Sequence, residues 1–206
     1  MGSGMKLFIF FLTRGILVFM FTFILFSLIR TRYFKYLKKN SNPAREFLLS
    51  VFVGFIAVLF LFMFTPNAYI ANHGINLTSE NFDFVGNFKD RINSGSWGVN
   101  IYPFKTIKSY IKYSGIFHTF INVIGNMIVF MPLTFLLAII YKKLECFYKL
   151  FIISLASSLF IEAVQFFVGR AVDIDDVILN VTGGMLGYLL FRLCKRMNFK
   201  ITKISK

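Results

Sequence analysis

Acidic residues gather in a short stretch of the last third of the chain, and one arginine accompanies them. Carboxylates supply the hard oxygen ligands that Mg²⁺ and Mn²⁺ prefer, and an arginine can hold a phosphate through two parallel hydrogen bonds. These residue types permit metal-dependent chemistry on a phosphorylated head group, with Mg²⁺ or Mn²⁺ as candidate cofactor, although their spacing matches no established metal motif. The candidate metal ligands are Glu162, Asp173, Asp175 and Asp176, and the arginine is Arg170.

Acid–base groups are present as well, but no nucleophile is evident. A histidine titrates near neutral pH and can carry a proton, so the candidate catalytic residues are His118, Glu162, Asp173 and Asp176. No serine or cysteine stands beside a general base in the sequence, as nucleophilic catalysis requires. The sequence therefore leaves open whether the protein is an enzyme. Asp175 is expected to matter less than its neighbours if its side chain points outward.

Further polar residues recur at helical spacing, so that each set shares one face of a helix. His118, Asn122 and Asn126 are four residues apart. Because a helix rises about 1.5 Å per residue, we expect Asn122 and Asn126 at depths similar to that of Glu162, and His118 nearer the rim. An unpaired carboxylate costs at least about 2.5–3.5 kcal/mol near the bilayer centre, so we expect one outward-opening polar funnel. The expected ligand-binding residues are Asn122, Asn126, Glu162, Gln165, Arg170, Asp173, Asp176 and Asn180.

A structural role is the alternative for several of these residues. Asn and Gln often act only as hydrogen-bonding links between membrane helices, each worth about 0.6 kcal/mol. This alternative is as strong as the site role for Asn122 and for Gln165. Gly183 and Gly187 form a small-residue pair of the kind that lets two helices approach closely, and we predict that packing role for them.

The elements that position these residues are membrane-spanning helices. The 206-residue chain is 57% hydrophobic and 16% charged, and its apolar residues concentrate in five runs long enough to cross a bilayer. This composition excludes a soluble domain, and the long runs exclude a transmembrane barrel. We predict an all-α polytopic helix bundle that forms a single integral membrane domain over residues 1–206. Its helices are expected at 7–29, 47–65, 117–140, 150–168 and 177–194.

The distribution of basic residues predicts the orientation of the chain. The formal net charge is +14, from 23 basic and 9 acidic residues. Segments 30–46, 141–149 and 192–206 together hold 15 lysines and arginines, against seven in the segments of the opposite side. Cytoplasmic loops carry such an excess, so we expect the N-terminus outside and the C-terminus in the cytoplasm. Because the basic residues lie between apolar runs, with no nucleic-acid-reading element, nucleic acid is not an expected partner.

The long outer loop, residues 66–116, ends in an amphipathic segment. Lys105, Lys108 and Lys112 follow at i, i+3 and i+7, while apolar residues mark another side of the same segment. This pattern predicts an interfacial helix over 101–113 that lies on the outer leaflet. An ordinary loop helix that covers the bundle is the alternative.

Three motifs follow one another along the chain. Residues 100–104 read NIYPF, residues 122–132 read N-x-x-x-N-x-x-x-F-x-P, and residues 158–187 read S-x-x-x-E-x-x-Q followed by R-x-x-D-x-D-D-x-x-x-N-x-x-G-x-x-x-G. In this order they resemble the signatures of the VanZ-like family of bacterial membrane proteins. The resemblance covers about 47–192, and it leaves the helix at 7–29 and the loop at 66–99 without a counterpart.

The resemblance implies a bacterial plasma-membrane protein that acts in the cell envelope and gives low-level protection against teicoplanin-like glycopeptides. It implies no accepted catalytic mechanism. Our first hypothesis is a non-enzymatic protein whose outward-facing pocket binds a lipid-linked cell-wall precursor or a lipoglycopeptide among the membrane lipids. The alternative is a divalent-metal-dependent enzyme acting on a lipid head group at the outer leaflet. A transporter and a scaffold for envelope enzymes are further alternatives.

Overall fold

The computed structural model describes residues 3–34, 36, 41–65, 99–109, 111–112, 115–167 and 172–199, without the side chains of 3–8 and 115–122. Within these ranges, five helices are long and apolar enough to cross a membrane. They are α1 (Ser3–Arg32), α3 (Pro43–Phe64), α7 (Gly115–Ile140), α8 (Phe147–Phe167) and α9 (Ile174–Arg196). The predicted all-α, multi-pass membrane fold is therefore confirmed.

Local signals explain where the spanning helices begin. α3 starts with Pro43, whose missing N–H costs nothing in the first turn, and the Asn42 side chain accepts a hydrogen bond from the N–H of Ala44 at 3.1 Å. α9 starts after Asp173, whose Oδ1 accepts a hydrogen bond from the N–H of Asp175 at 2.9 Å. Each spanning helix begins a few residues before its predicted run. At α3 and α9 the added residues include charged ones, which hydropathy leaves out.

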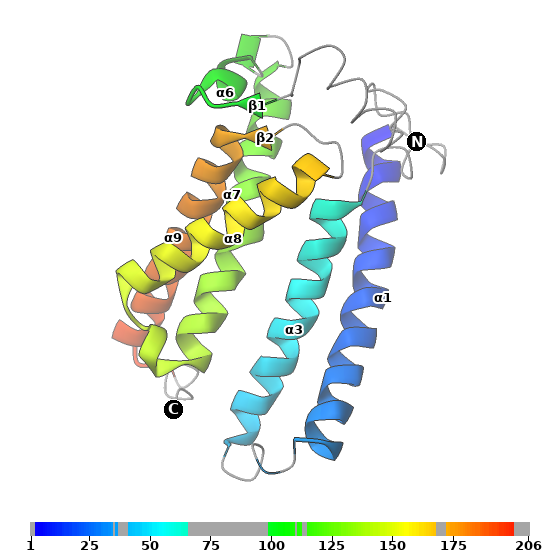
Figure 1. Cartoon of the computed structure of the whole chain (residues 1–206), viewed down its shortest axis with the longest axis vertical. Coiled ribbons are helices and arrows are strands. Elements are labelled where there is room, and N and C mark those ends of the chain that lie inside the picture. Colours follow the sequence, from blue (N-terminus) through cyan, green and yellow to red (C-terminus); the bar gives the residue numbers. More distant parts are fainter. Residues whose placement is uncertain are drawn as a thin grey trace. The chain divides into compact units, whose positions relative to one another are not determined.

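The chain divides into two compact units, and the first contains α1 and most of α3. In this unit the two helices run side by side (Figure 1). A Cβ atom at Gly54 would lie only 2.8 Å from the ring of Phe19, so the glycine lets α1 and α3 approach closely. The rings of Phe11 and Phe62 meet edge to face, with centroids 5.2 Å apart. Aromatic side chains therefore fill the contact between these two helices.

In the second unit, α7 packs against α9 (Figure 1). The contact is made by glycines of α9 that lie directly on the backbone of α7. A Cβ at Gly183 would overlap the carbonyl oxygen of Met127, and a Cβ at Gly187 would overlap that of Met131. Backbone atoms cannot move aside as a flexible side chain can, so only glycine fits at these two positions. The predicted packing role of this glycine pair is confirmed.

α8 joins the same unit beside the third glycine of α9, Gly184. The hydroxyl of Ser154 lies where a Cβ of Gly184 would stand, and Thr134 on α7 donates a hydrogen bond to the carbonyl oxygen of Gly184. Phe130 and Phe191 are completely buried in this core. Three helices are thus held together by close backbone approach, the hydroxyl contacts of Ser154 and Thr134, and large apolar side chains.

A small cap of extended chain and one short helix covers the start of α9. β1 (Val99–Asn100) pairs in parallel with β2 (Val172–Asp173), and α6 (Lys105–Ser109) contacts α9 (Figure 1). The helix predicted to start at residue 101 therefore begins later than expected, at Lys105. The reason is Phe104, whose φ of 63° places it in the left-handed region and ends the turn that precedes α6.

Candidate functional site

A polar cluster lies at the first turn of α9, where residues from β1, α7 and α8 meet the acidic residues. The N-terminus of a helix carries a partial positive charge that stabilises carboxylates, so the acidic residues suit this position. We define the polar cluster by six residues from these elements. They are Asn100, Asn126, Glu162, Asp173, Asp175 and Asp176.

Asp175 is the most deeply buried acid of the cluster, with 1% of its surface exposed. Its Oδ2 accepts hydrogen bonds from the backbone N–H groups of Thr106 at 2.9 Å and Ile107 at 3.2 Å, and its Oδ1 accepts one from the N–H of Phe104. Asp175 was expected to matter less only if its side chain pointed outward, and that condition is not met. Its carboxylate caps the N-terminus of α6, and we call the segment that it holds, residues 100–107, the clamped turn.

Asp173 bonds to the first residue of the clamped turn, and Glu162 bonds to the backbone of Asp173. Oδ1 of Asp173 accepts a hydrogen bond from the side-chain amide of Asn100 at 3.0 Å. Oε2 of Glu162 accepts one from the backbone N–H of Asp173 at 3.0 Å, and only 3% of Glu162 is exposed. Glu162, which we expected to face a partner or water, thus has a hydrogen-bond partner in the backbone of Asp173.

Two further predicted residues link the helices of the second unit. The side-chain amide of Asn126 on α7 donates a hydrogen bond to Oδ1 of Asp176 at 2.8 Å. Asn180 is 2% exposed, and its amide donates to the hydroxyl of Ser158 on α8 at 3.0 Å. The structure thus brings Asn126, Glu162, Asp173, Asp176 and Asn180 into one region. Asp176 differs from the other acids of the cluster in being only half-buried.

Four other predicted site residues either lie in the first unit or have side chains that the structure does not describe. Gln165 belongs to the first unit, where its amide donates a hydrogen bond to the carbonyl oxygen of Met63 on α3 at 3.1 Å. This contact is the helix-linking role considered above as the alternative. Arg170 lies outside the described residues. His118 and Asn122 lie in α7, but their side chains are outside the description, so the roles of these three residues stay predictions.

The acidic residues predicted to bind a metal ion are not arranged as metal ligands. In the described ranges, no three or more His, Cys, Asp or Glu side chains are arranged to hold a metal ion. Asp175 directs both carboxylate oxygens at backbone N–H groups, and one oxygen of Asp173 accepts two hydrogen bonds. These oxygens act as hydrogen-bond acceptors within the fold. The donor set of Glu162, Asp173, Asp175 and Asp176 therefore does not fit a bound Mg²⁺ or Mn²⁺.

Sequence reasoning missed the role of Asn100 and the backbone of the clamped turn. The side-chain oxygen of Asn100 accepts a hydrogen bond from the N–H of Tyr102 at 3.2 Å, while its amide group donates to Thr106 at 3.0 Å. An asparagine that bonds to its own backbone two residues later is a common turn signal. The NIYPF motif carried this signal, but nothing in it identified Asp175 as the partner.

The clamped turn presents apolar side chains outward. Ile101, Tyr102 and Phe104 are 69%, 66% and 52% exposed. The Lys105 ammonium lies 5.6 Å from the centre of the Tyr102 ring, so a positive charge stands beside these apolar groups. A left-handed residue costs about 1–2 kcal/mol when it carries a Cβ. The fold accepts this cost at Phe104 while leaving its ring exposed.

Comparisons with known proteins agree with the sequence motifs. A family model described as VanZ/LLP1 matches residues 52–195, which is most of the chain. The chain is 42% identical over 83 residues to a curated relative, Protein VanZ from Enterococcus faecium. That match covers 39% of this chain and 51% of the relative, so the chain spans about half the length of the curated relative. No solved structure matches the chain.

Proposed function

The chain belongs to the VanZ-like family of membrane proteins, and we propose that it contributes to resistance against teicoplanin-type glycopeptides in a bacterial plasma membrane. The proposed orientation has the N-terminus outside and the C-terminus in the cytoplasm, as the basic-residue count indicates. In this orientation the clamped turn and the polar cluster face outward. The protein acts there by binding its ligand and carries out no reaction on it.

One observation carries this proposal: a buried carboxylate holds a turn whose apolar side chains are exposed. Asp175 fixes the backbone of Phe104, Thr106 and Ile107, so the turn is held while its side chains point away from the protein. Teicoplanin-type glycopeptides carry an acyl chain, and lipid-linked cell-wall precursors carry a polyprenyl chain, so both present a long apolar chain. Ile101 and Phe104 offer such a chain an apolar contact at a fixed position.

The polar part of the ligand meets the polar cluster in this proposal. Asp176 is the acid of the cluster that is only half-buried, so it is the acid best placed to contact a bound molecule. Lys105 and Lys108 are exposed beside the turn and offer ionic contacts to phosphate or carboxylate groups. The ligand class is therefore an amphiphile with an acyl chain and a polar, charged head.

The test compares two glycopeptides in a susceptible host that expresses the full chain. We expect protection against teicoplanin but not against a glycopeptide that lacks an acyl chain. Ile101→Asn with Phe104→Asn removes the apolar groups, and asparagine tolerates the left-handed backbone at position 104. We expect this variant, present at normal amounts in the membrane, to protect no better than an empty vector.

The control variant replaces two exposed apolar residues at the far end of the second unit, Met197→Asn and Phe199→Asn. We expect it to protect as the unchanged protein does. Equal protection against both glycopeptides, or full protection by the Ile101 and Phe104 variant, would contradict the proposal. A changed envelope lipid after incubation with purified protein and Mg²⁺ would favour the enzyme alternative instead.

A further inference from the structure

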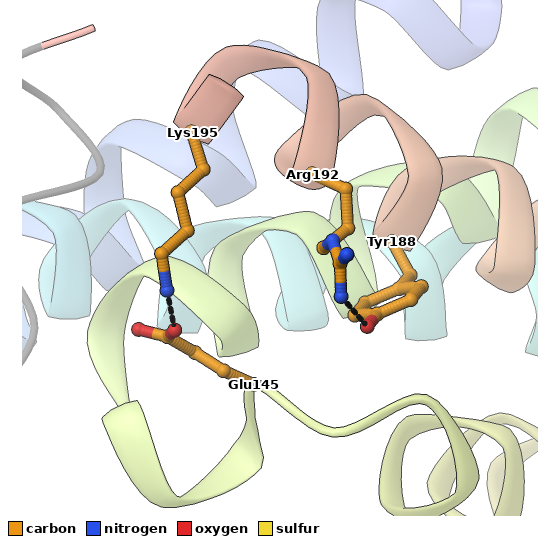
Figure 2. Close-up of polar contacts among 4 residues, drawn as sticks. All are labelled: Glu145, Tyr188, Arg192 and Lys195. Carbon is orange, nitrogen blue, oxygen red and sulfur yellow. Dashed lines mark hydrogen bonds and ion pairs between the residues drawn. The ribbon is translucent and has the colours of Figure 1, made fainter. Parts of the chain in front are cut away.

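The polar cluster at the start of α9 is rich in acidic residues, whereas the other end of α9 is rich in basic ones. A pocket of about 930 Å³ opens beside the last turns of this helix. Basic residues of α9, namely Arg192, Lys195 and Arg196, line it together with Tyr188 and with Glu145, which stands between α7 and α8. Figure 2 shows the Lys195 side chain extending from α9 to Glu145, and the Arg192 side chain directed at the hydroxyl of Tyr188. Nothing in the family motifs accounts for this pocket.

The pocket carries an excess of positive charge. Within the part of the chain that the structure describes, the lining contains one carboxylate, Glu145, and it forms an ion pair with Lys195 (Figure 2). Arg192 donates instead to the neutral hydroxyl of Tyr188 at 3.2 Å. With three cations and one anion in the lining, the local charge is about +2.

The pocket also has an apolar side. Leu189 and Leu193 belong to its lining and are 51% and 57% exposed. They lie on α9, a helix of 23 residues that is long enough to span a bilayer. The last turn of such a helix lies at the level of the lipid phosphates, and the turns before it lie among the acyl chains. Arginine, lysine and tyrosine at this level are the usual partners of head groups.

We propose that this pocket binds the head-group phosphate of an anionic membrane phospholipid. Arg192 and the Tyr188 hydroxyl donate to the phosphate oxygens, since a guanidinium binds phosphate through two parallel hydrogen bonds. Arg196 supplies the second unpaired charge, and the lipid acyl chains lie over Leu189 and Leu193. Basic pockets between membrane helices bind anionic lipids by this chemistry. The inference is independent of the proposed glycopeptide function, because it concerns the opposite end of α9.

The test uses the full chain purified in a neutral detergent, with phosphatidylglycerol, phosphatidylcholine and inorganic phosphate as separate probes. Lipid binding is measured by native mass spectrometry and by the shift of the unfolding temperature. We expect phosphatidylglycerol to bind more tightly than phosphatidylcholine and to raise the unfolding temperature, and inorganic phosphate to have little effect. Arg192→Gln with Arg196→Gln removes two charges, each worth about 1 kcal/mol, and should weaken phosphatidylglycerol binding by about 30-fold.

Two matched variants separate a specific pocket from general attraction. Lys142→Gln with Lys143→Gln also removes two exposed charges near this end of the unit, outside the pocket lining, and should leave binding unchanged. Glu145→Gln raises the local charge and should tighten phosphatidylglycerol binding, a gain that unfolding cannot imitate. Equal loss in the Lys142 and Lys143 variant, or equal binding of the two lipids, would overturn the proposal. A shift as large with inorganic phosphate would assign the pocket to a free anion instead.

Discussion

The carboxylate of Asp175 accepts a hydrogen bond from the backbone N–H of Thr106, 69 positions earlier in the chain, at 2.9 Å. This contact joins two segments that the sequence presents as separate motifs, the NIYPF segment and the acidic stretch before α9. An acidic residue that read as a metal ligand is a helix cap for α6. Its carboxylate supplies the acceptors that the backbone N–H groups at the start of α6 need.

We expect Asp175→Asn to loosen the clamped turn. An amide has one acceptor oxygen and turns an NH₂ group toward the N–H donors, so at least one of them loses its partner. Hydrogen bonds to a charged acceptor contribute about 1.5–3 kcal/mol, and the free energy of unfolding in detergent should fall by about that amount. The backbone amides of Phe104, Thr106 and Ile107 should exchange their hydrogen faster than in the unchanged protein.

The matched control for this change is Glu145→Gln, which also removes one negative charge. The side chains of Lys195 and Glu145 are 51% and 14% exposed, and an ion pair that solvent reaches from one side contributes about 1 kcal/mol. We expect a small loss of stability and unchanged amide exchange in the clamped turn. Equal losses in the two variants would show that the buried position of Asp175 adds nothing.

We expect Gly183→Ala and Gly187→Ala each to destabilise the protein by about 1–3 kcal/mol, the usual cost of overpacking. The added methyl group meets a carbonyl oxygen of α7, and the two helices must move apart to admit it. Gly125→Ala is the control, because a Cβ there would have no atom within 4 Å. Alanine favours a helix over glycine by about 1 kcal/mol, so this control should be neutral or more stable. Thermal unfolding of the three variants decides the comparison.

Two serines of α8 should respond differently to the same substitution. Ser158 and Ser154 are both fully buried. Ser158→Ala removes the acceptor of the Asn180 amide and should cost about 1–3 kcal/mol. Among the described residues, the Ser154 hydroxyl has no hydrogen-bond partner, so Ser154→Ala should be neutral or stabilising. If Ser154→Ala lowers the stability as much as Ser158→Ala, the loss at Ser158 comes from packing and not from its hydrogen bond with Asn180.

The orientation of the chain is tested by cysteine labelling in intact cells. Cys146 and Cys194 are free thiols and are first replaced by serine. A single cysteine at Lys108 should then react with a membrane-impermeant reagent, while one at Met197 should react only after the cells are opened. The reverse pattern would turn the clamped turn toward the cytoplasm and would contradict the proposed function.

The five spanning helices were predictable because burial in lipid requires about 20 apolar residues in succession. Their starts were less predictable, since polar residues such as Asn42 and Asp173 begin the helices without contributing to hydropathy. The helix over 101–113 was predicted to begin too early. Its amphipathic spacing gave no sign that Phe104 would adopt a left-handed conformation.

The residues of the polar cluster were largely predictable, but their partners were not. Intramembrane polar residues are costly, so Glu162 and Asn180 stood out by type alone. Which atoms they bond to depends on contacts between distant segments. Asp175 bonds to backbone N–H groups, which every residue except proline possesses. No residue type in the clamped turn therefore marks it as the partner of an acid.

The clamped turn and the acidic residues that hold it lie far apart in the sequence, and this separation sets the order in which they are synthesised. The amide of Asn100 and the carboxylate of Asp173 are 73 positions apart, and the residues between them include all of α7 and α8. A ribosome delivers residues 100–107 to the membrane before any acid that anchors them has been translated. Both intervening helices must be inserted before the anchor arrives. A chain whose translation stops short of Asp175 can therefore contain four spanning helices and still leave the NIYPF segment without its cap.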